Sequence, residues 1–120
     1  MNKNKDTIFA LSTPFGKSAL AVIRVSGLNS YKIVKKISTN MPKKPNQSVL
    51  NRIAFDKNKN IDQTITTFFK APKSFTGEDM VEISIHGGGA VIKKTLSVLG
   101  SFKNTRIAEP GEFTRRAFEN

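Results

Sequence analysis

The 120-residue chain contains no cysteine, no tryptophan and only one histidine. The absence of cysteine excludes disulfides, thiolate metal sites and cysteine nucleophiles together, and it favours a cytoplasmic location. Because His86 is the only imidazole, a histidine-based metal site is not expected either. The sequence therefore predicts no metal site.

The chain also lacks a long apolar run. A membrane-spanning helix needs roughly 18 apolar residues, and no segment approaches that length. The first residues are polar and basic, and they lead into Thr7–Leu11, which is too short for the apolar part of a signal peptide. We expect a cytoplasmic protein that does not associate with a membrane.

Acidic residues are scarce in the first half. Residues 1–60 carry 12 basic and 2 acidic side chains, whereas residues 61–120 carry 8 and 7. A basic half suggests an anionic partner such as RNA. However, 15 of the 20 basic residues are lysines, and strongly hydrated lysines also cover ordinary solvated surfaces. Both interpretations stay open at this stage.

Hydrophobic periodicity and turn residues predict nine elements in the order β-β-α-β-β-β-α-β-α. Strands are expected at 7–11, 18–25, 48–55, 61–69, 79–86 and 105–108, and helices at 28–38, 90–99 and 113–119. The helices are too few for a doubly wound sheet. We expect an α+β fold with one mixed β-sheet and two to three helices packed mainly on one face. The last helix has no stop signal, so residues 1–120 are expected to form one domain of a longer protein.

Two glycine motifs could be mistaken for catalytic signatures. Gly16-Lys17-Ser18 resembles a phosphate-binding loop, but the position five residues before Gly16 is Leu11 instead of glycine. His86-Gly87-Gly88-Gly89 resembles an esterase oxyanion hole, but the chain contains no G-x-S-x-G nucleophile. The second motif is better interpreted as a strand-to-helix turn. Its glycines either let a ligand approach the backbone or simply make a tight turn.

Two charged residues are predicted in the middle of strands. Glu82 lies on the face of its strand opposite three aliphatic residues, and Arg24 interrupts an otherwise apolar strand. A carboxylate presents two acceptors side by side, which suits a ligand with two adjacent N–H donors or the fork of an arginine. A plain Arg24–Glu82 ion pair and a ligand site shared by both residues remain as alternatives.

Two further segments are rich in charge. Ser74–Asp79 is a loop with two adjacent acids, which we interpret as surface that precedes a strand. Pro110–Arg116 is the start of a helix, with Glu112 near the positive end of the helix dipole. Its arginine pair is expected to be solvated or to face an anion.

Several segments together resemble the N-terminal domain of the MnmE/TrmE family of tRNA-modification GTPases, in the same order from about residue 6 to the end. The most specific are S-F-T-G-E-D at 74–79 followed by Glu82 and H-G-G at 86–88, and P-G-E-F at 110–113 followed by R-A-F at 116–118. Residues 28–70 contribute little to the resemblance.

The resemblance implies a fold like the folate-binding domain of the glycine-cleavage T-protein. It also implies a homodimer that binds a tetrahydrofolate derivative, such as 5-formyl- or 5,10-methylene-tetrahydrofolate, near the dimer interface. The folate would donate the one-carbon unit for a carboxymethylaminomethyl-type group at C5 of the wobble uridine (U34) of tRNA. The flavoprotein MnmG/GidA would be the partner in this reaction.

By the same resemblance, Glu82 would hold the amino-pyrimidinone edge of the pterin and Arg24 would be a second folate contact. His86, Gly87 and Gly88 would supply backbone around the ring. No catalytic residue is expected, because the GTPase motifs of the family, with their GTP, K⁺ and Mg²⁺, do not occur in this sequence. On these grounds the domain alone is expected to be inactive. The alternatives to folate binding are a basic RNA-binding domain and a purely structural dimerisation domain with no ligand.

Overall fold

The computed structural model describes residues 5–12, 20–56, 59–86 and 89–120. Within them the order of elements is the predicted one. They are β1 (Thr7–Ser12), β2 (Leu20–Ser26), α1 (Ser30–Lys36), β3 (Ser48–Asp56), β4 (Lys59–Phe69), β5 (Met80–His86), α2 (Gly89–Gly100), β6 (Thr105–Ile107) and α3 (Glu112–Glu119). The Gly16-Lys17-Ser18 segment lies outside the described residues, as do residues 57 and 58 between β3 and β4.

The six strands form one mixed sheet in the order β3-β4-β5-β2-β1-β6. All neighbouring strands are antiparallel except β1 and β6, which are parallel. Strands β3 and β4, which are consecutive in the sequence, pair as a hairpin with Leu50 opposite Ile65. The two central strands, β2 and β5, bring residues far apart in the sequence directly opposite each other, including Arg24 and Glu82.

The alternation of β5 divides the sheet into two faces. Val81, Ile83 and Ile85 are fully buried and share one face, as predicted. On this core face α1 contributes Ile33 and Val34, and α2 contributes Leu99, to a single cluster of buried apolar residues. The opposite face, which carries Glu82, is called the open face below.

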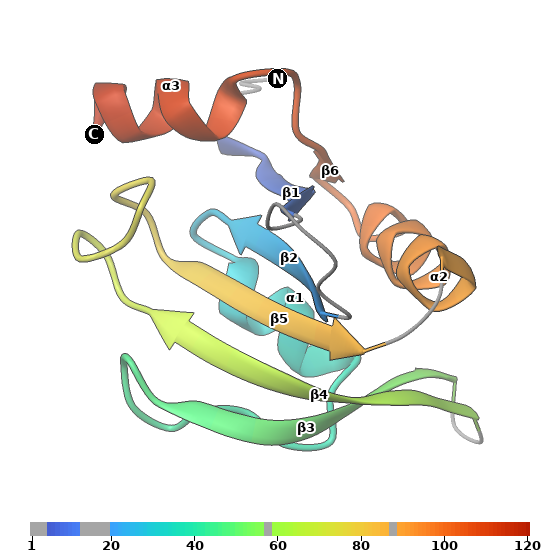
Figure 1. Ribbon diagram of the computed structural model, residues 1–120. Helices are drawn as coiled ribbons and strands as arrows, with labels where there is room; N and C mark the ends of the chain where they lie inside the picture. The colour runs from blue at the N-terminus through green and yellow to red at the C-terminus, as the bar shows by residue number, and fades with distance from the viewer. Residues whose placement is uncertain (1–4, 13–19, 57–58, 87–88) are drawn as a thin grey trace.

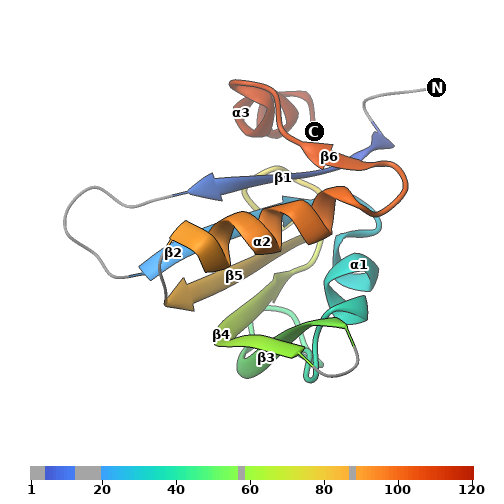
Figure 2. The same ribbon diagram turned by 90° about the vertical axis from the view of Figure 1, so that its right-hand side faces the viewer.

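The helices are arranged as expected for most of the fold. In Figure 1, α1 lies behind the sheet, and α2 crosses in front of β2 and β5 in the turned view of Figure 2. Helix α3 is different, because it lies beyond β1, at the edge of the molecule opposite the β3–β4 hairpin (Figures 1 and 2). The α+β class with helices mainly on one face is therefore confirmed. The likeness to the T-protein domain stays a prediction.

Candidate ligand-binding site

The open face carries an ion pair between its two central strands. Arg24 on β2 and Glu82 on β5 are register partners, and Arg24 Nε donates a hydrogen bond of 2.9 Å to Glu82 Oε2. The side chains are 36% and 25% exposed, so the pair is neither dry nor fully solvated. The Arg24–Glu82 ion pair, one of the two alternatives considered from the sequence, is therefore present. A ligand role for the same residues is compatible with it and stays a prediction.

The Glu82 carboxylate retains acceptor capacity. Each carboxylate oxygen can accept two hydrogen bonds. Among the described residues, Arg24 Nε is the hydrogen-bond partner of Glu82 and occupies one position on Oε2. The register partner on the other side, Thr67 of β4, is engaged with Ser48 through their hydroxyls at 2.7 Å. A ligand on the open face could therefore use Oε1 and the second position on Oε2.

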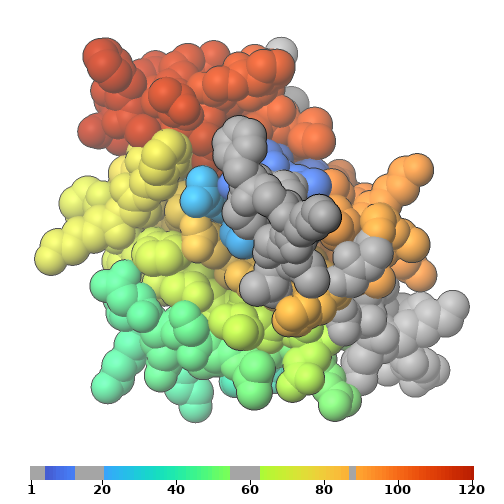
Figure 3. Space-filling view, viewed as in Figure 1, coloured from blue at the N-terminus to red at the C-terminus, as the bar shows by residue number. Residues whose placement is uncertain are grey.

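An aromatic residue missed at the sequence level borders this pair. Phe75 lies in the loop between β4 and β5, and Arg24 Cζ is 5.6 Å from the centre of its ring. The Phe75 side chain is 51% exposed. Figure 3 shows this loop in yellow, projecting beside atoms of β2 in light blue, with α3 above and β3 and β4 below. Phe75 thus lies beside the Arg24 member of the Arg24–Glu82 pair.

Of the predicted glycine turn, the structure describes the two flanking residues, His86 and Gly89. His86 is the last residue of β5, and its side chain is exposed. It shares the open face with Glu82, because both alternate with the buried aliphatics of β5. Gly87 and Gly88 lie outside the described residues, and α2 begins at Gly89. The role of this turn around the ring stays a prediction.

A buried carboxylate organises the edge of the sheet beside the site. Glu112 is 1% exposed at the first position of α3, and Arg106 on β6 donates two hydrogen bonds of 2.7 Å to its two oxygens. Arg106 also donates to Asp6 at 3.0 Å. These hydrogen bonds from Arg106 lower the pKa of Glu112 to about 2 although burial opposes the change, and the pKa of Arg106 is raised in turn.

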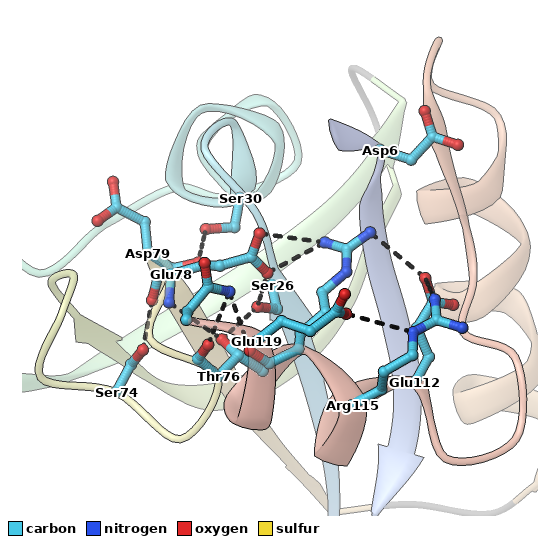
Figure 4. A network of polar contacts seen from close by, with 12 residues as sticks. Asp6, Ser26, Ser30, Ser74, Thr76, Glu78, Asp79, Glu112, Arg115 and Glu119 are labelled. Carbon is cyan, nitrogen blue, oxygen red and sulfur yellow. Dashed lines mark hydrogen bonds and ion pairs between the residues drawn. The ribbon is translucent and has the colours of Figure 1, made fainter. Parts of the chain in front are cut away.

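A second pair joins α3 to the loop that carries Phe75. Arg116 is 4% exposed, and its Nη1 donates to Glu78 Oε1 at 3.0 Å. The same Glu78 oxygen accepts a hydrogen bond of 2.9 Å from Ser26 of β2. Figure 4 shows this network, in which Glu78 and Glu112 converge from different elements. We call Glu78, Arg116, Glu112 and Arg106 the clasp.

The clasp corrects two predictions. Arg116 is neither solvated nor facing an external anion, because two carboxylates of the chain itself surround it. The segment Ser74–Asp79 is not simply surface, since Thr76 is fully buried and Asp79 is 8% exposed. Asp79 accepts hydrogen bonds from the Ala71 amide at 2.9 Å and from Lys70 at 3.3 Å. Arg115 does fit the solvated interpretation, because half of its side chain is exposed.

A basic hollow lies elsewhere, beside α1. It has a volume of about 150 Å³ and is lined by Asn29, Lys32, Ile33, Lys36, Phe102 and Lys103. Lys36 Nζ is 5.6 Å from the centre of the Phe102 ring. Within the described part of the chain, no carboxylate pairs with any of its three lysines. The hollow thus presents three ammonium groups around a concave surface.

Two kinds of feature are not found among the described residues. No group of three or more His, Cys, Asp or Glu side chains is placed to hold a metal ion. None of the helices in these ranges is long and apolar enough to cross a membrane.

The fold and the site define a small α+β domain whose open sheet face carries a half-buried acid–base pair beside a clasped loop. The motifs on which the clasp and the pair depend agree with a known family. Residues 7–120 match the family model described as the N-terminus of the GTP-binding protein TrmE, and the chain belongs to this family.

Relatives from bacteria and mitochondria agree with this assignment. The chain is 44% identical over 115 residues to the tRNA modification GTPase MnmE of Thermotoga maritima, covering 96% of the chain and 25% of that relative. It is 50% identical over 117 residues to MnmE of Endomicrobium trichonymphae, covering 97% and 25%. The mitochondrial tRNA modification GTPase mss1 of Schizosaccharomyces pombe is 45% identical over 117 residues, covering 95% and 23%. The chain thus spans about a quarter of the length of these relatives.

Proposed function

We propose that this domain binds a tetrahydrofolate derivative on the open face of its sheet and serves a tRNA-modification GTPase as its folate-binding and dimerisation module. The observation that supports folate binding is the half-buried Glu82 carboxylate, which Arg24 holds through a hydrogen bond to Oε2. Membership of the TrmE N-terminal family supports the link to tRNA modification.

The chemistry of the pair fits a pterin. The amino-pyrimidinone edge of a pterin presents two parallel N–H donors, which match two carboxylate acceptors. Arg24 orients the Glu82 carboxylate through Nε, and its Nη groups can donate to a carbonyl of the ligand. His86 and the turn at Gly87 and Gly88 would border the ring. Both 5-formyl- and 5,10-methylene-tetrahydrofolate carry the required edge.

In the longer protein this site would supply the one-carbon unit that is added at C5 of the wobble uridine of tRNA. The partner in that reaction would be a flavoprotein of the MnmG/GidA type. GTP, K⁺ and Mg²⁺ would act in a GTPase domain that is not contained in residues 1–120. This domain would then contribute binding and orientation, and its own side chains would not hydrolyse GTP.

The proposal is tested by titrating the chain with 5-formyltetrahydrofolate in a calorimeter. Glu82→Gln keeps the size of the side chain but turns one acceptor into a donor, so we expect about a 10- to 100-fold weaker affinity. Glu109→Gln, which changes an exposed acid that is not a member of the pair, is the matched control and should bind like the unmodified chain. Absence of binding to the unmodified chain, or equal affinities for both variants, would contradict the proposal.

Dimerisation has a separate supporting observation on the same face. Leu50 and Ile65 are register partners on the β3–β4 hairpin, with 62% and 44% of their side chains exposed. Two adjacent exposed aliphatics are unfavourable in water and suit a second copy of the chain. Light scattering should give twice the chain mass, and Leu50→Glu should give the monomer mass. A monomer mass for the unmodified chain at high micromolar concentration would contradict this part of the proposal.

A second candidate function, RNA binding, is favoured by the basic hollow. Lys32, Lys36 and Lys103 would neutralise phosphates of tRNA, and such contacts weaken steeply as salt increases. Replacing all three lysines with glutamine should weaken tRNA binding and flatten its salt dependence. The same replacement at Lys43, Lys44 and Lys73, which are also exposed, is the control. Equal effects of both triple variants would indicate a general effect of charge and contradict an RNA site at the hollow.

A further inference from the structure

Two contacts restrict the conformation of Arg24, and one of them comes from a loop. A half-exposed arginine with a single hydrogen bond retains much rotational freedom. Here Nε is bound to Glu82 at 2.9 Å, while Cζ lies 5.6 Å from the Phe75 ring centre. A guanidinium held at an edge and over an aromatic face has both its direction and its plane restricted. Phe75 therefore restricts the Arg24 side chain.

The residues on either side of Phe75 are firmly anchored. Thr76 is fully buried, and its hydroxyl is 2.6 Å from the hydroxyl of Ser26 on β2. The Ser74 hydroxyl donates to the carbonyl of Glu78 within the loop. Because both of its neighbours are anchored, the half-exposed side chain of Phe75 is held in place by the loop.

Helix α3 completes the anchoring. Arg116 donates to Glu78 at 3.0 Å, and Asn120 Nδ2 donates to the Thr76 carbonyl at 3.2 Å. Gly77 has φ of +80°, and a Cβ at this position would lie 2.8 Å from the Asn120 Cβ. The helix thus contacts the loop at three consecutive residues, from Thr76 to Glu78. Any movement of α3 would shift the loop and, with it, the ring of Phe75.

We propose that Phe75 is a positioning residue for Arg24, and that the Arg116–Glu78 pair sets Phe75, so that α3 controls the geometry of the Arg24–Glu82 pair from the edge of the sheet. The inference rests on the proposed function, since it assigns these residues to the same ligand site. Its geometric content can nevertheless be tested without any ligand.

The ligand-free test follows the Arg24 side chain by NMR. In the unmodified chain the Arg24 Nε–Hε signal should be protected from exchange by the bond to Glu82, and the neighbouring Hδ protons should be displaced by the Phe75 ring current. Phe75→Leu should remove the displacement and speed the exchange, and Phe75→Tyr, which keeps the ring, should restore both. Unchanged Arg24 signals in Phe75→Leu would overturn the proposal.

The control of Phe75 by α3 is tested with adjacent arginines. Arg116→Met should reproduce the effect of Phe75→Leu on Arg24, whereas Arg115→Met, one residue away and half-exposed, should leave Arg24 unchanged. If Arg116→Met does not fold, Glu78→Gln tests the same contact with a smaller change. Backbone amide signals of the core strands identify variants that have lost the fold. Equal effects of the two arginine variants would overturn the role of the clasp.

Ligand affinity then separates this inference from the proposed function. Losing the cation–π contact should weaken 5-formyltetrahydrofolate binding about 2- to 5-fold in Phe75→Leu, and Phe75→Tyr should restore it. If the unmodified chain does not bind folate while Arg24 responds to Phe75→Leu, the proposed function fails and the positioning role stands. If folate binds through Glu82 and neither the Arg24 signals nor the affinity responds to Phe75→Leu, the inference fails alone.

Discussion

Replacing Glu112 with glutamine should reveal how much the clasp contributes to stability. Glu112 is 1% exposed, and Arg106 donates two hydrogen bonds of 2.7 Å to it. Its pKa is lowered from an ordinary 4.5 to about 2, chiefly by Arg106. Since each pKa unit corresponds to about 1.4 kcal/mol, ionised Glu112 contributes roughly 3 kcal/mol at neutral pH. That is a large fraction of the roughly 5–15 kcal/mol typical of a domain.

The sign of the pH dependence follows from the lowered pKa. The stabilisation is complete above the unfolded-state pKa near 4.5 and is lost as pH falls toward the folded-state value near 2. These two values predict that about 2 kcal/mol of it is already lost at pH 3. Glu112→Gln removes the titrating group, so its stability should decrease less between pH 7 and pH 3.

The assay is urea denaturation of both proteins at pH 7 and pH 3. We expect Glu112→Gln to lower the free energy of unfolding by about 3 kcal/mol at pH 7 and by about 1 kcal/mol at pH 3. Glu119→Gln is the control, because its exposed pair with Arg115 at 3.5 Å should contribute less than about 1 kcal/mol. A constant difference between Glu112→Gln and the unmodified chain at both pH values would refute this account of the clasp.

Two further substitutions test local contacts. Gly77→Ala should lower the free energy of unfolding by about 2–3 kcal/mol, because the positive φ and the clash with Asn120 both disfavour a side chain. Gly111→Ala is the control: its φ is +75° but it has open space around it, so the substitution should cost only about 1 kcal/mol. Equal losses of the two variants in thermal melts would contradict the predicted clash. Asn51→Ala should cost about 2 kcal/mol in urea denaturation, because the buried side-chain oxygen Oδ1 of Asn51 accepts hydrogen bonds from the backbone amides of Thr39 and Asn40. A loss below about 0.5 kcal/mol would contradict this role.

The strands and helices could be predicted because their signals are local. Alternation in β5 separated Val81, Ile83 and Ile85 from Glu82, and the structure places the two sets on opposite faces. The pairing of Arg24 with Glu82 could also be predicted as one alternative, because a half-buried charge in a strand requires a partner of opposite charge. Element ends differ by one or two residues, as hydrogen bonding rather than pattern determines them.

The clasp could not be predicted from periodicity because its partners are distant in the sequence. Arg116 reaches Glu78 across 38 residues, and Arg106 reaches Asp6 across 100. One local signal was nevertheless present. Glu112, Arg116 and Asn120 follow each other at intervals of four, so they share one side of α3 and form a polar stripe facing the molecule. Such a stripe indicates buried ion pairs rather than a solvated helix.

The ligand role of the Arg24–Glu82 pair is tested most directly by NMR of the chain during titration with 5-formyltetrahydrofolate. Saturating ligand should shift the Glu82 carboxyl carbon and the Arg24 Nε–Hε signal together, with the same dissociation constant, and should leave the lysines around the basic hollow unchanged. Shifts confined to Lys32, Lys36 and Lys103, with Glu82 and Arg24 unaffected, would contradict the account.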